Sequence, residues 1–263
     1  MYFCNMISKN LLKYIRSLEL KKYRKQEGCF VAEGPKVVGD LMKVMSPIRL
    51  VAMEEWYHQT GTVPRDIDVV VTDDELRKVS FLQHPQQVMG VFPIPGRETV
   101  DSKELLNGIL INEELILALD GVQDPGNLGT IIRIADWFGI RTLVCSTDTA
   151  DVYNPKVVQA TMGSIARVKV IYTDLPAFLK QLPSGIPVYG TFLDGHDIYQ
   201  QTLTCNGVIV MGNEGKGISQ EVNTLVNHRL LIPHYPADRP TADSLNVAIA
   251  TAITCAEFRR VMK

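Results

Sequence analysis

Three segments in the C-terminal half of the chain concentrate side chains that could bind a ligand and act on it. They are DGVQDPGNLGT (120–130), GNEGKG (212–217) and IPHYPADRPTADSLN (232–246), each rich in glycine, amide or charged residues. Each one follows an apolar run that predicts a buried strand. Because ligands of open α/β sheets bind at the carboxyl ends of the strands, we expect these three loops to converge on one pocket.

The first loop enters a helix that carries an arginine in an unusual place. Arg133 lies off the face that should meet the core, which we expect to be formed by Leu128, Ile131, Ile134, Ala135 and Phe138. A positive charge this close to the start of a helix gains nothing from the helix dipole. This favours a site role for Arg133, with a surface salt bridge as the alternative. Asn127 could place its amide near a ligand, or it could serve as a turn residue.

The second loop, GNEGKG, combines three glycines with a carboxylate. Its glycines let the backbone approach a ligand closely, and its amides could bind an anion. The spacing matches neither G-x-x-x-x-G-K-[ST] nor G-x-G-x-x-G. Glu214 would repel a phosphate, so hydroxyls, an amine or a sulfonium suit this loop better. The alternative is a tight turn locked by hydrogen bonds of its Asn and Glu side chains.

The third loop leads into a long helix at 244–262. Asp243 or Ser244 is the expected N-cap. The predicted buried stripe has small alanines that could also pack against another subunit, and it consists of Leu245, Ala248, Ile249, Ala252 and Ala256. Asn246 lies beside this stripe, either as a site residue or as a core amide bonded to the backbone.

The elements that must position these loops form two blocks in which strands alternate with helices, which predicts an α/β fold. In the first block, expected strands are 29–34, 48–53, 68–72 and 87–92, and expected helices are 7–26, 35–44, 54–59 and 73–80, with Asp73 as a cap. The polar segment 93–108 reads as a linker. In the second block, expected strands are 115–121, 141–146, 168–173, 187–193, 207–212 and 229–233, and expected helices are 130–138, 154–164, 175–182, 218–226 and 244–262. We therefore expect one domain at 1–97 and another at 108–263.

Charge and composition restrict the possible functions. The 263 residues carry a net charge of −2, which does not by itself indicate a nucleic-acid-binding protein. The charge is unevenly distributed, because the segment 8–25 has a single acid, Glu19, among the basic residues Lys9, Lys13, Arg16, Lys21, Lys22, Arg24 and Lys25. This segment is either a solvated helix face or a patch that contacts phosphates.

Metal sites, disulfides and membrane spans are not expected. The five cysteines are scattered without a C-x-x-C pair, and the five histidines form no ligand cluster. No apolar run reaches the roughly 18 residues of a membrane span, and the first residues lack the apolar region of a signal peptide. We therefore expect a cytoplasmic protein.

The order and identity of the motifs resemble a known family. DGVQDPGNLGTIIRIADWFG, MGS at 162–164, VIVMGNEGKGIS and DSLNVAIATAI follow one another as in the SpoU/TrmH family of the SPOUT superfamily, which contains RNA 2′-O-ribose methyltransferases. This resemblance covers residues 115–262. FVAEGPKVVGDLM and the segment 84–92 resemble, more weakly, the optional N-terminal substrate-binding domain of the family.

The resemblance implies a fold, a cofactor and a partner. The implied fold is a C-terminal α/β trefoil-knot (SPOUT) methyltransferase domain with a smaller N-terminal α/β domain that binds RNA. S-adenosylmethionine would bind in the knot, and the family forms homodimers whose active sites use both subunits. The positions expected to contact the methyl donor are Thr191, Gly212, Asn213, Gly217, Ile232 and Leu245.

The resemblance also assigns catalytic roles, without a metal. Arg133 matches the catalytic arginine of the family, and our hypothesis is that it engages the substrate hydroxyl and an adjacent phosphate. Asn127 and Glu214 would position the ribose or that arginine. Ser244 and Asn246 would order the loop and the donor pocket.

Alternative functions stay open at this point. The N-terminal domain favours large-subunit (23S-type) ribosomal RNA as substrate over transfer RNA, because such a domain can recognise a folded stem or loop by its shape. A noncatalytic RNA-binding or ribosome-assembly protein is the alternative from another class, although an inactive relative would be expected to lose Arg133 or one of the loops. A nicotinamide-dependent enzyme is disfavoured because neither block has G-x-G-x-x-G after its first strand.

Overall fold

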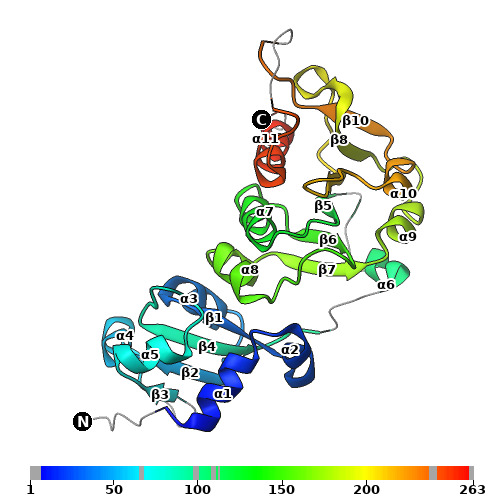
Figure 1. The fold of residues 1–263 in the computed structure, drawn as a ribbon. Helices are drawn as coiled ribbons and strands as arrows, with labels where there is room; N and C mark the ends of the chain where they lie inside the picture. Colours follow the sequence, from blue (N-terminus) through cyan, green and yellow to red (C-terminus); the bar gives the residue numbers. More distant parts are fainter. Residues whose placement is uncertain are drawn as a thin grey trace. The chain divides into compact units, whose positions relative to one another are not determined.

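The computed structural model describes residues 7–64, 68–96, 101–107, 111, 113–236 and 242–260. The chain forms two compact units (Figure 1). Unit 1 comprises residues 1–96 together with 151–166, and unit 2 comprises residues 97–150 and 167–263. Unit 1 therefore includes a segment that belongs, in sequence, to the second α/β block.

Unit 1 is built on a four-stranded mixed sheet. Its strands are β1 (Cys29–Glu33), β2 (Arg49–Ala52), β3 (Asp68–Val70) and β4 (Val88–Pro93), so all four expected strands are present. Their order is β1-β4-β2-β3, with β4 antiparallel to both β1 and β2 and with β2 parallel to β3. Alternate residues of β1 enter different cores, because successive side chains of a strand point to opposite faces. Phe30 belongs to one core cluster and Val31 to the other.

The helices of unit 1 cover both faces of this sheet. They are α1 (Lys9–Ser17), α2 (Lys21–Glu27), α3 (Pro35–Met42), α4 (Glu54–Thr60), α5 (Asp73–Val79) and α8 (Pro155–Ala160), followed by the short 3₁₀ helix η1 (Ser164–Ala166). The single helix expected over 7–26 is in fact two helices. The expected cap of α5 was placed one residue late, because Thr72 is the N-cap and forms a capping box with Glu75.

One of the basic residues counted in the 8–25 segment points inward. Arg24 is only 2% exposed, and its guanidinium donates to the carbonyls of Leu18 (2.8 Å) and Glu19 (2.7 Å). It also forms an ion pair with Asp151 at 2.5 Å. Arg24 therefore joins α2 to the 151–166 segment within unit 1 and does not belong to an exposed phosphate-binding patch.

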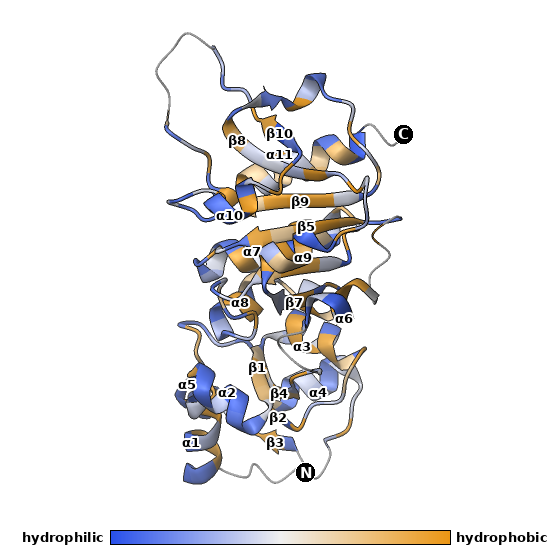
Figure 2. Ribbon diagram, turned by 90° about the vertical axis from the view of Figure 1, so that its right-hand side faces the viewer, coloured by the Kyte–Doolittle hydropathy of each residue, from blue (hydrophilic) through white to orange (hydrophobic). Residues whose placement is uncertain are grey.

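Unit 2 is built on a six-stranded parallel sheet. Its strands are β5 (Leu115–Asp120), β6 (Thr142–Ser146), β7 (Lys169–Thr173), β8 (Val188–Asp197), β9 (Gly207–Gly212) and β10 (His228–Leu231), in the order β10-β8-β9-β5-β6-β7. Each neighbouring pair in that order is parallel. Every residue of β5, β6 and β9 is buried, and Figure 2 shows β5 and β9 hydrophobic along most of their length. Strands that are covered on both faces need such continuous apolar runs.

The helices of unit 2 are α6 (Ser102–Asn107), α7 (Pro125–Trp137), α9 (Leu175–Lys180), α10 (Gln220–Asn223) and α11 (Val247–Arg260), with a 3₁₀ helix η2 (Ile198–Gln200) after β8. α6 lies within the segment expected to be only a linker. α7 begins five residues earlier than expected, because Asp124 caps it by accepting the amide of Asn127 at 2.8 Å and Pro125 occupies its first turn.

The start and the buried face of α11 both differ from expectation. Neither Asp243 nor Ser244 caps this helix. Instead, Asn246 Oδ1 accepts the amides of Ala248 (2.9 Å) and Ile249 (3.3 Å).

Of the predicted buried stripe, only Ala248 is fully buried, whereas Leu245 is 51% exposed and Ile249 is 53% exposed. The helix instead buries Val247, Ala248, Thr251, Thr254, Cys255, Glu257 and Phe258. The hydroxyls of Thr251 and Thr254 bond to carbonyls one turn earlier, which satisfies them inside the protein.

The expected knot and the expected absence of membrane-spanning helices can be compared with the described residues only. The expected knot would involve the stretch between β10 and α11, and residues 237–241 of that stretch lie outside the described residues. Within the described ranges, no helix combines the length and the apolar character needed to cross a membrane.

Candidate active site

The first two loops lie side by side because their strands are neighbours. β5 and β9 pair in parallel with Asp120 opposite Gly212, so both chains leave the sheet at the same edge. The carboxylate of Asp120 accepts the amide of Ser219 at 2.6 Å. Asn213 Nδ2 donates to the carbonyl of Gly121 at 2.6 Å. These hydrogen bonds hold the starts of the first and second loops together.

Asn213 also shapes its own loop. Its Oδ1 accepts the amides of Gly215 (2.9 Å) and Lys216 (3.0 Å), and its backbone forms a two-way bridge with Gly217. The tight turn that we considered as an alternative is therefore present. It leaves the next side chain, Glu214, directed toward the first loop.

Glu214 accepts three hydrogen bonds from the first loop and the start of α7. Its carboxylate receives the amides of Gln123 (3.2 Å) and Asp124 (3.0 Å) and Nδ2 of Asn127 (3.1 Å). Burial raises the pKa of Glu214, but hydrogen bonds from its own amide, Asn127, Asp124 and Gln123 outweigh burial and hold the pKa below its usual value. The carboxylate is therefore ionised at neutral pH and organises the first loop.

The third loop joins the same network through a pair of amides. Asn127 Oδ1 accepts Nδ2 of Asn246 at 2.9 Å, while Asn246 Oδ1 caps α11. We call these two consecutive hydrogen bonds, which join Glu214 to Asn127 and Asn127 to Asn246, the amide relay. It connects all three loops, although the residues are up to 119 positions apart. The expected convergence on one pocket is met only in part, because the cavity described below is lined by the second and third loops and not by residues 120–130.

Arg133 stands apart from this relay on the exposed surface of α7. Two other arginines near α7 are engaged: Arg167 pairs with Asp136 at 2.7 Å, and Arg259 donates to the carbonyl of Phe138 at 2.7 Å. Among the residues that the structure describes, Arg133 has no hydrogen bond and no ion pair. The salt bridge considered as an alternative is not formed there, so its guanidinium is available to a ligand or to a second chain.

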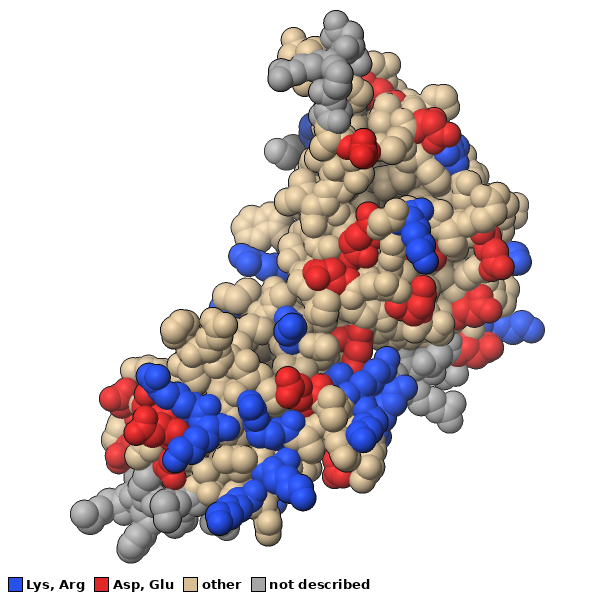
Figure 3. All heavy atoms as spheres, in the orientation of Figure 1, with Lys and Arg blue, Asp and Glu red and all other residues tan. Residues whose placement is uncertain are grey.

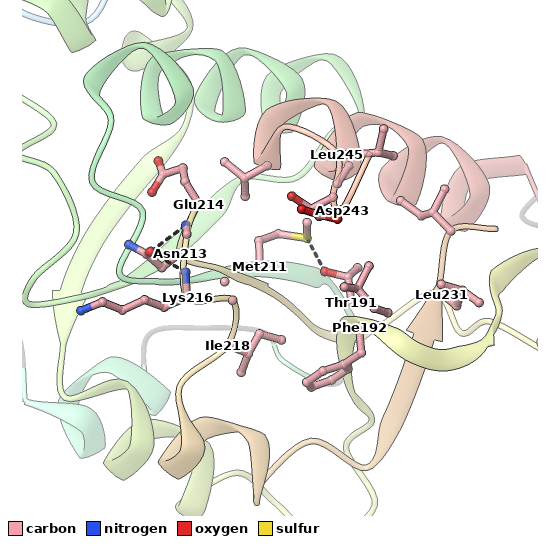
Figure 4. A pocket seen from close by; sticks show the side chains of 18 residues that line it. Thr191, Phe192, Met211, Asn213, Glu214, Lys216, Ile218, Leu231, Asp243 and Leu245 are labelled. Atoms are coloured by element: carbon pink, nitrogen blue, oxygen red, sulfur yellow. Dashed lines mark hydrogen bonds between the residues drawn. The ribbon is translucent and has the colours of Figure 1, made fainter. Parts of the chain in front are cut away.

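A cavity of about 410 Å³ lies between the second and third loops. All six positions expected to contact the methyl donor line it, as do the expected catalytic residues Glu214 and Ser244. Figure 4 shows Met211, Ile218 and Leu231 around the space, with Glu214 and Asp243 near it. The lining residues that sequence reasoning missed are Phe192, Leu193, Met211, Gly215, Lys216, Ile218, Leu231, Asp243, Val247 and Ala250. Most of them are adjacent in sequence to a predicted site residue, and this adjacency is the sequence feature that could have identified them.

The predicted site residues thus form two groups. Thr191, Gly212, Asn213, Gly217, Ile232, Leu245 and Ser244 lie at the cavity, whereas Asn127, Asn246 and Arg133 are not among its lining residues. Glu214 belongs to both groups, since it lines the cavity and begins the amide relay. The cavity and α7 are therefore linked through one carboxylate.

Gly212 is required by close backbone packing. A Cβ at this position would lie 2.3 Å from the backbone of Gly217 and Ile218, so no larger residue fits without moving the loop. On the same wall of the cavity, Thr191 Oγ1 of β8 lies 3.9 Å from the sulfur of Met211 in the neighbouring strand β9.

The cavity suits a small ligand that is partly apolar and carries a positive charge. Its walls combine the apolar Phe192, Ile218 and Val247 with charged side chains, of which two, Glu214 and Asp243, are acidic and one, Lys216, is basic. Its volume falls within the range of small-molecule sites, which are mostly apolar with a few placed polar groups. Among the described residues, no group of three or more His, Cys, Asp or Glu could hold a metal ion.

The α/β fold of unit 2, with its six-stranded parallel sheet, is that of the SPOUT methyltransferases, to which its structural neighbours belong. The chain belongs to the SpoU rRNA methylase family, whose family model matches residues 114–256. A second family model, that of the MRM3-like substrate binding domain, matches residues 9–90. Members of the SpoU family use S-adenosylmethionine as methyl donor.

Individual relatives agree with this assignment over nearly the whole chain. A protein from Porphyromonas gingivalis assigned to the TrmH family of RNA methyltransferases is 42% identical, with a TM-score of 0.81 over 98% of this chain and 100% of that one. An rRNA methyltransferase from Sinorhizobium meliloti with bound AdoMet is 31% identical, with a TM-score of 0.82 over 98% and 97%. The 23S rRNA (guanosine(2553)-2′-O)-methyltransferase RlmP of Bacillus subtilis is 29% identical over 93% of this chain and 94% of its own.

Proposed function

We propose that this protein transfers a methyl group from S-adenosylmethionine to a ribose 2′-hydroxyl of RNA, with large-subunit ribosomal RNA as substrate. The observation that carries the proposal is the amide relay, which links the cavity of unit 2 to α7, the helix that carries Arg133. The named functions of full-length relatives such as RlmP support the choice of reaction and RNA. Such a substrate would place the activity in the cytoplasm.

The cavity residues would bind the methyl donor. The bound donor supplies a reactive methyl group on a positively charged sulfur. Gly212 and Gly217 keep the backbone close to it, and Thr191, Asn213, Ile232 and Leu245 complete the walls. The carboxylates of Glu214 and Asp243 suit the positive charges of this ligand. Ser244 also lines the cavity and would order the third loop there.

Arg133 would act on the acceptor. A sugar hydroxyl is a very weak acid, so a guanidinium beside it stabilises the charge that develops on oxygen during transfer. The same planar group can bind an adjacent phosphate with two hydrogen bonds. Transfer would depend on holding the oxygen, the methyl carbon and the sulfur in line. The new oxygen–carbon bond would replace the sulfur–carbon bond of the donor, which would leave as a neutral thioether, and the hydroxyl proton would pass to solvent.

Glu214 and the two asparagines would position these groups and would not take the proton. The low pKa of Glu214 makes it a weak base, and its oxygens already accept three N–H groups of the first loop. Asn127 and Asn246 transmit that geometry to α7 and α11. The relay therefore fixes the helix of Arg133 relative to the cavity.

We further propose that the protein is a homodimer whose interface includes the surface of α7 and α11. These helices pack together, and each exposes a large apolar side chain: Trp137 is 84% exposed and Ile249 is 53% exposed. Trp137 lies one helical turn from Arg133, so a subunit that covers it would bring its own residues close to that arginine. Sedimentation should give a dimer for the protein and a monomer for Trp137→Glu. Tyr199→Glu, which changes an exposed aromatic residue elsewhere in unit 2, is the matched control and should remain dimeric.

The two expected domains have different proposed roles. Residues 1–97 would bind the RNA and residues 108–263 would carry out the transfer, as the two family models support. The exposed lysines of α1 and α2 would contact phosphates, and Figure 3 shows blue atoms gathered over these helices. Such contacts are electrostatic and should weaken with added salt.

The decisive experiment is a methyl-transfer assay. Purified protein, radiolabelled S-adenosylmethionine and total RNA are incubated, and the product is located by the resistance of its 3′ linkage to alkali. We expect label in large-subunit ribosomal RNA, and a loss of about a hundredfold or more in Arg133→Ala with donor binding unchanged. Arg141→Ala removes another exposed arginine of unit 2 and should keep full activity.

The other outcomes separate the alternatives. Label confined to transfer RNA would keep the reaction and replace the substrate. If no RNA is labelled while the donor still binds, the noncatalytic RNA-binding function replaces the proposed one.

A further inference from the structure

Unit 1 contains a second cavity, of about 300 Å³, that the methyl-transfer reaction does not use. It is lined by Glu33 at the end of β1, by Phe81 and Leu82 after α5, and by Pro155, Lys156 and Gln159 of α8. We call it the Glu33 cavity. Its walls are mainly apolar, with a carboxylate as the acidic group, so it resembles a small ligand site in character.

The carboxylate of Glu33 is buried but keeps unused acceptor capacity. Glu33 is 6% exposed, and its two oxygens accept the amide of Phe81 at 2.9 Å and the hydroxyl of Ser80. A carboxylate offers about four acceptor positions, so half of them are taken by these two described neighbours. Burial raises the pKa of this carboxyl, which the bonds from Ser80 and Phe81 and the charge of Arg16 only partly offset. A ligand that brings two further N–H donors would therefore stabilise it.

The aromatic wall of the cavity is held in place by a basic residue of α1. Arg16 Nη1 donates to the carbonyl of Ser80 at 2.7 Å, and its guanidinium lies 5.5 Å from the centre of the Phe81 ring. α1 and α2 carry five of the exposed lysines of unit 1, which are Lys9, Lys13, Lys21, Lys22 and Lys25. The cavity therefore adjoins the helices best suited to the phosphates of an RNA strand.

We propose that the Glu33 cavity binds one unpaired guanine of the RNA substrate, with the base against Phe81 and its N1–H and N2–H groups donating to the Glu33 carboxylate. Among the four RNA bases, guanine alone presents two adjacent N–H donors from neighbouring ring and amino nitrogens. Proteins read single-stranded RNA by stacking bases on aromatic side chains and bonding to their edges. This inference rests on the proposed RNA substrate, and it concerns a nucleotide other than the one that is methylated.

The test compares RNA strands on the full-length protein, without methyl donor. The probes are fluorescently labelled decamers of uridine with one central guanosine, inosine or adenosine, and inosine lacks the N2 amino group. Anisotropy should show the guanosine strand bound at least about fivefold more tightly than the other two, the size expected for one bidentate contact to a base. Equal affinity for the three strands would overturn the proposal.

Variants locate the effect. Glu33→Gln should abolish the preference for guanosine, and Phe81→Leu should weaken binding of the guanosine strand. Glu27→Gln makes the same charge change on the exposed surface of α2 and should keep the preference. A folded Glu33→Gln protein that still prefers guanosine would contradict the assignment. Should that variant fail to fold, the strand comparison on the unmodified protein and Phe81→Leu decide the question.

This assay and the methyl-transfer assay can fail independently. A preference for guanosine without methyl transfer would refute the proposed catalytic function but would still support a guanine site in the Glu33 cavity. Methyl transfer without guanosine preference would remove only the guanine site.

Discussion

Glu214 in unit 2 and Glu33 in unit 1 both line a cavity and both accept hydrogen bonds from a loop that is distant in sequence, yet their pKa values shift in opposite directions. Glu214 lies on an exposed loop and accepts three N–H groups from Gln123, Asp124 and Asn127, and its pKa is lowered. Glu33 is 6% exposed and accepts two bonds, and its pKa is raised. The balance between burial, which raises the pKa, and the number of hydrogen-bond donors, which lower it, decides the direction of each pKa shift.

This contrast suggests different uses for the two carboxylates. Glu214 is fully satisfied by its own chain, so it organises a site and does not need a ligand to stabilise its charge. Glu33 is incompletely satisfied in a mostly apolar cavity, so it can gain from an added donor. Changes at one site should therefore leave the other site unaffected.

Gly212→Ala should damage unit 2 alone. The added Cβ would lie 2.3 Å from the backbone of Gly217 and Ile218, and the resulting shift should weaken S-adenosylmethionine binding by about a hundredfold in calorimetry. Gly39→Ala in α3 of unit 1 is the control, because its Cβ would have no neighbour within 4 Å and this residue does not line the cavity of unit 2. Guanosine preference of the RNA strands should survive in both variants. Unchanged donor affinity in Gly212→Ala would show that the donor binds elsewhere.

Glu214→Gln should reduce methyl transfer by about tenfold. The glutamine replaces one acceptor oxygen by an amino group that faces N–H donors of the first loop, and a lost hydrogen bond of this kind costs about 1–3 kcal/mol. Single-turnover rates would measure the loss. Glu221→Gln removes an exposed carboxylate of α10 and should be neutral. If the two variants behaved alike, the relay would have no role in transfer.

The two carboxylates should also respond oppositely to acid. For Glu214, whose folded pKa is lowered, the contribution to stability is present above the ordinary glutamate pKa of about 4.3 and is lost as pH falls through the folded pKa. For Glu33, whose folded pKa is raised, the contribution is present below that ordinary value and is lost as pH rises through the folded pKa.

Denaturant unfolding of the wild type, Glu33→Gln and Glu214→Gln at several pH values would check this. Between pH 7 and pH 4, acid should favour the wild type over Glu33→Gln. Only toward the lower end of that range should acid begin to favour Glu214→Gln over the wild type. Parallel pH profiles would mean that the contrast between the two carboxylates is absent.

Thr72→Ala should give the smallest effect, confined to unit 1. It removes the capping box of α5, next to the loop that holds Phe81, and should lower the free energy of unfolding by about 1 kcal/mol. Calorimetric melting would measure it, with the exposed Thr202→Ala as control. Donor affinity should stay the same, and a matching loss of donor affinity would show that the two sites are not separate.

The sequence by itself determined the α/β class, the strands of both sheets and the three loops of unit 2. Buried strands are apolar along a short contiguous run, and glycine, proline and amide residues mark the turns between them, so this information is local. The family motifs and the predicted positions that line the cavity of unit 2 were visible for the same reason, since each motif is one continuous segment.

Only the tertiary structure decided which side chains meet. Arg24 was counted among exposed basic residues, but it pairs with Asp151, 127 positions away. The buried stripe of α11 was wrong because its partners lie on α7 and β9, and these partners select a face that contains Thr251 and Thr254. The amide relay and the Glu33 cavity join residues from distant elements, because burial and hydrogen bonding depend on neighbours in space that residue order does not specify.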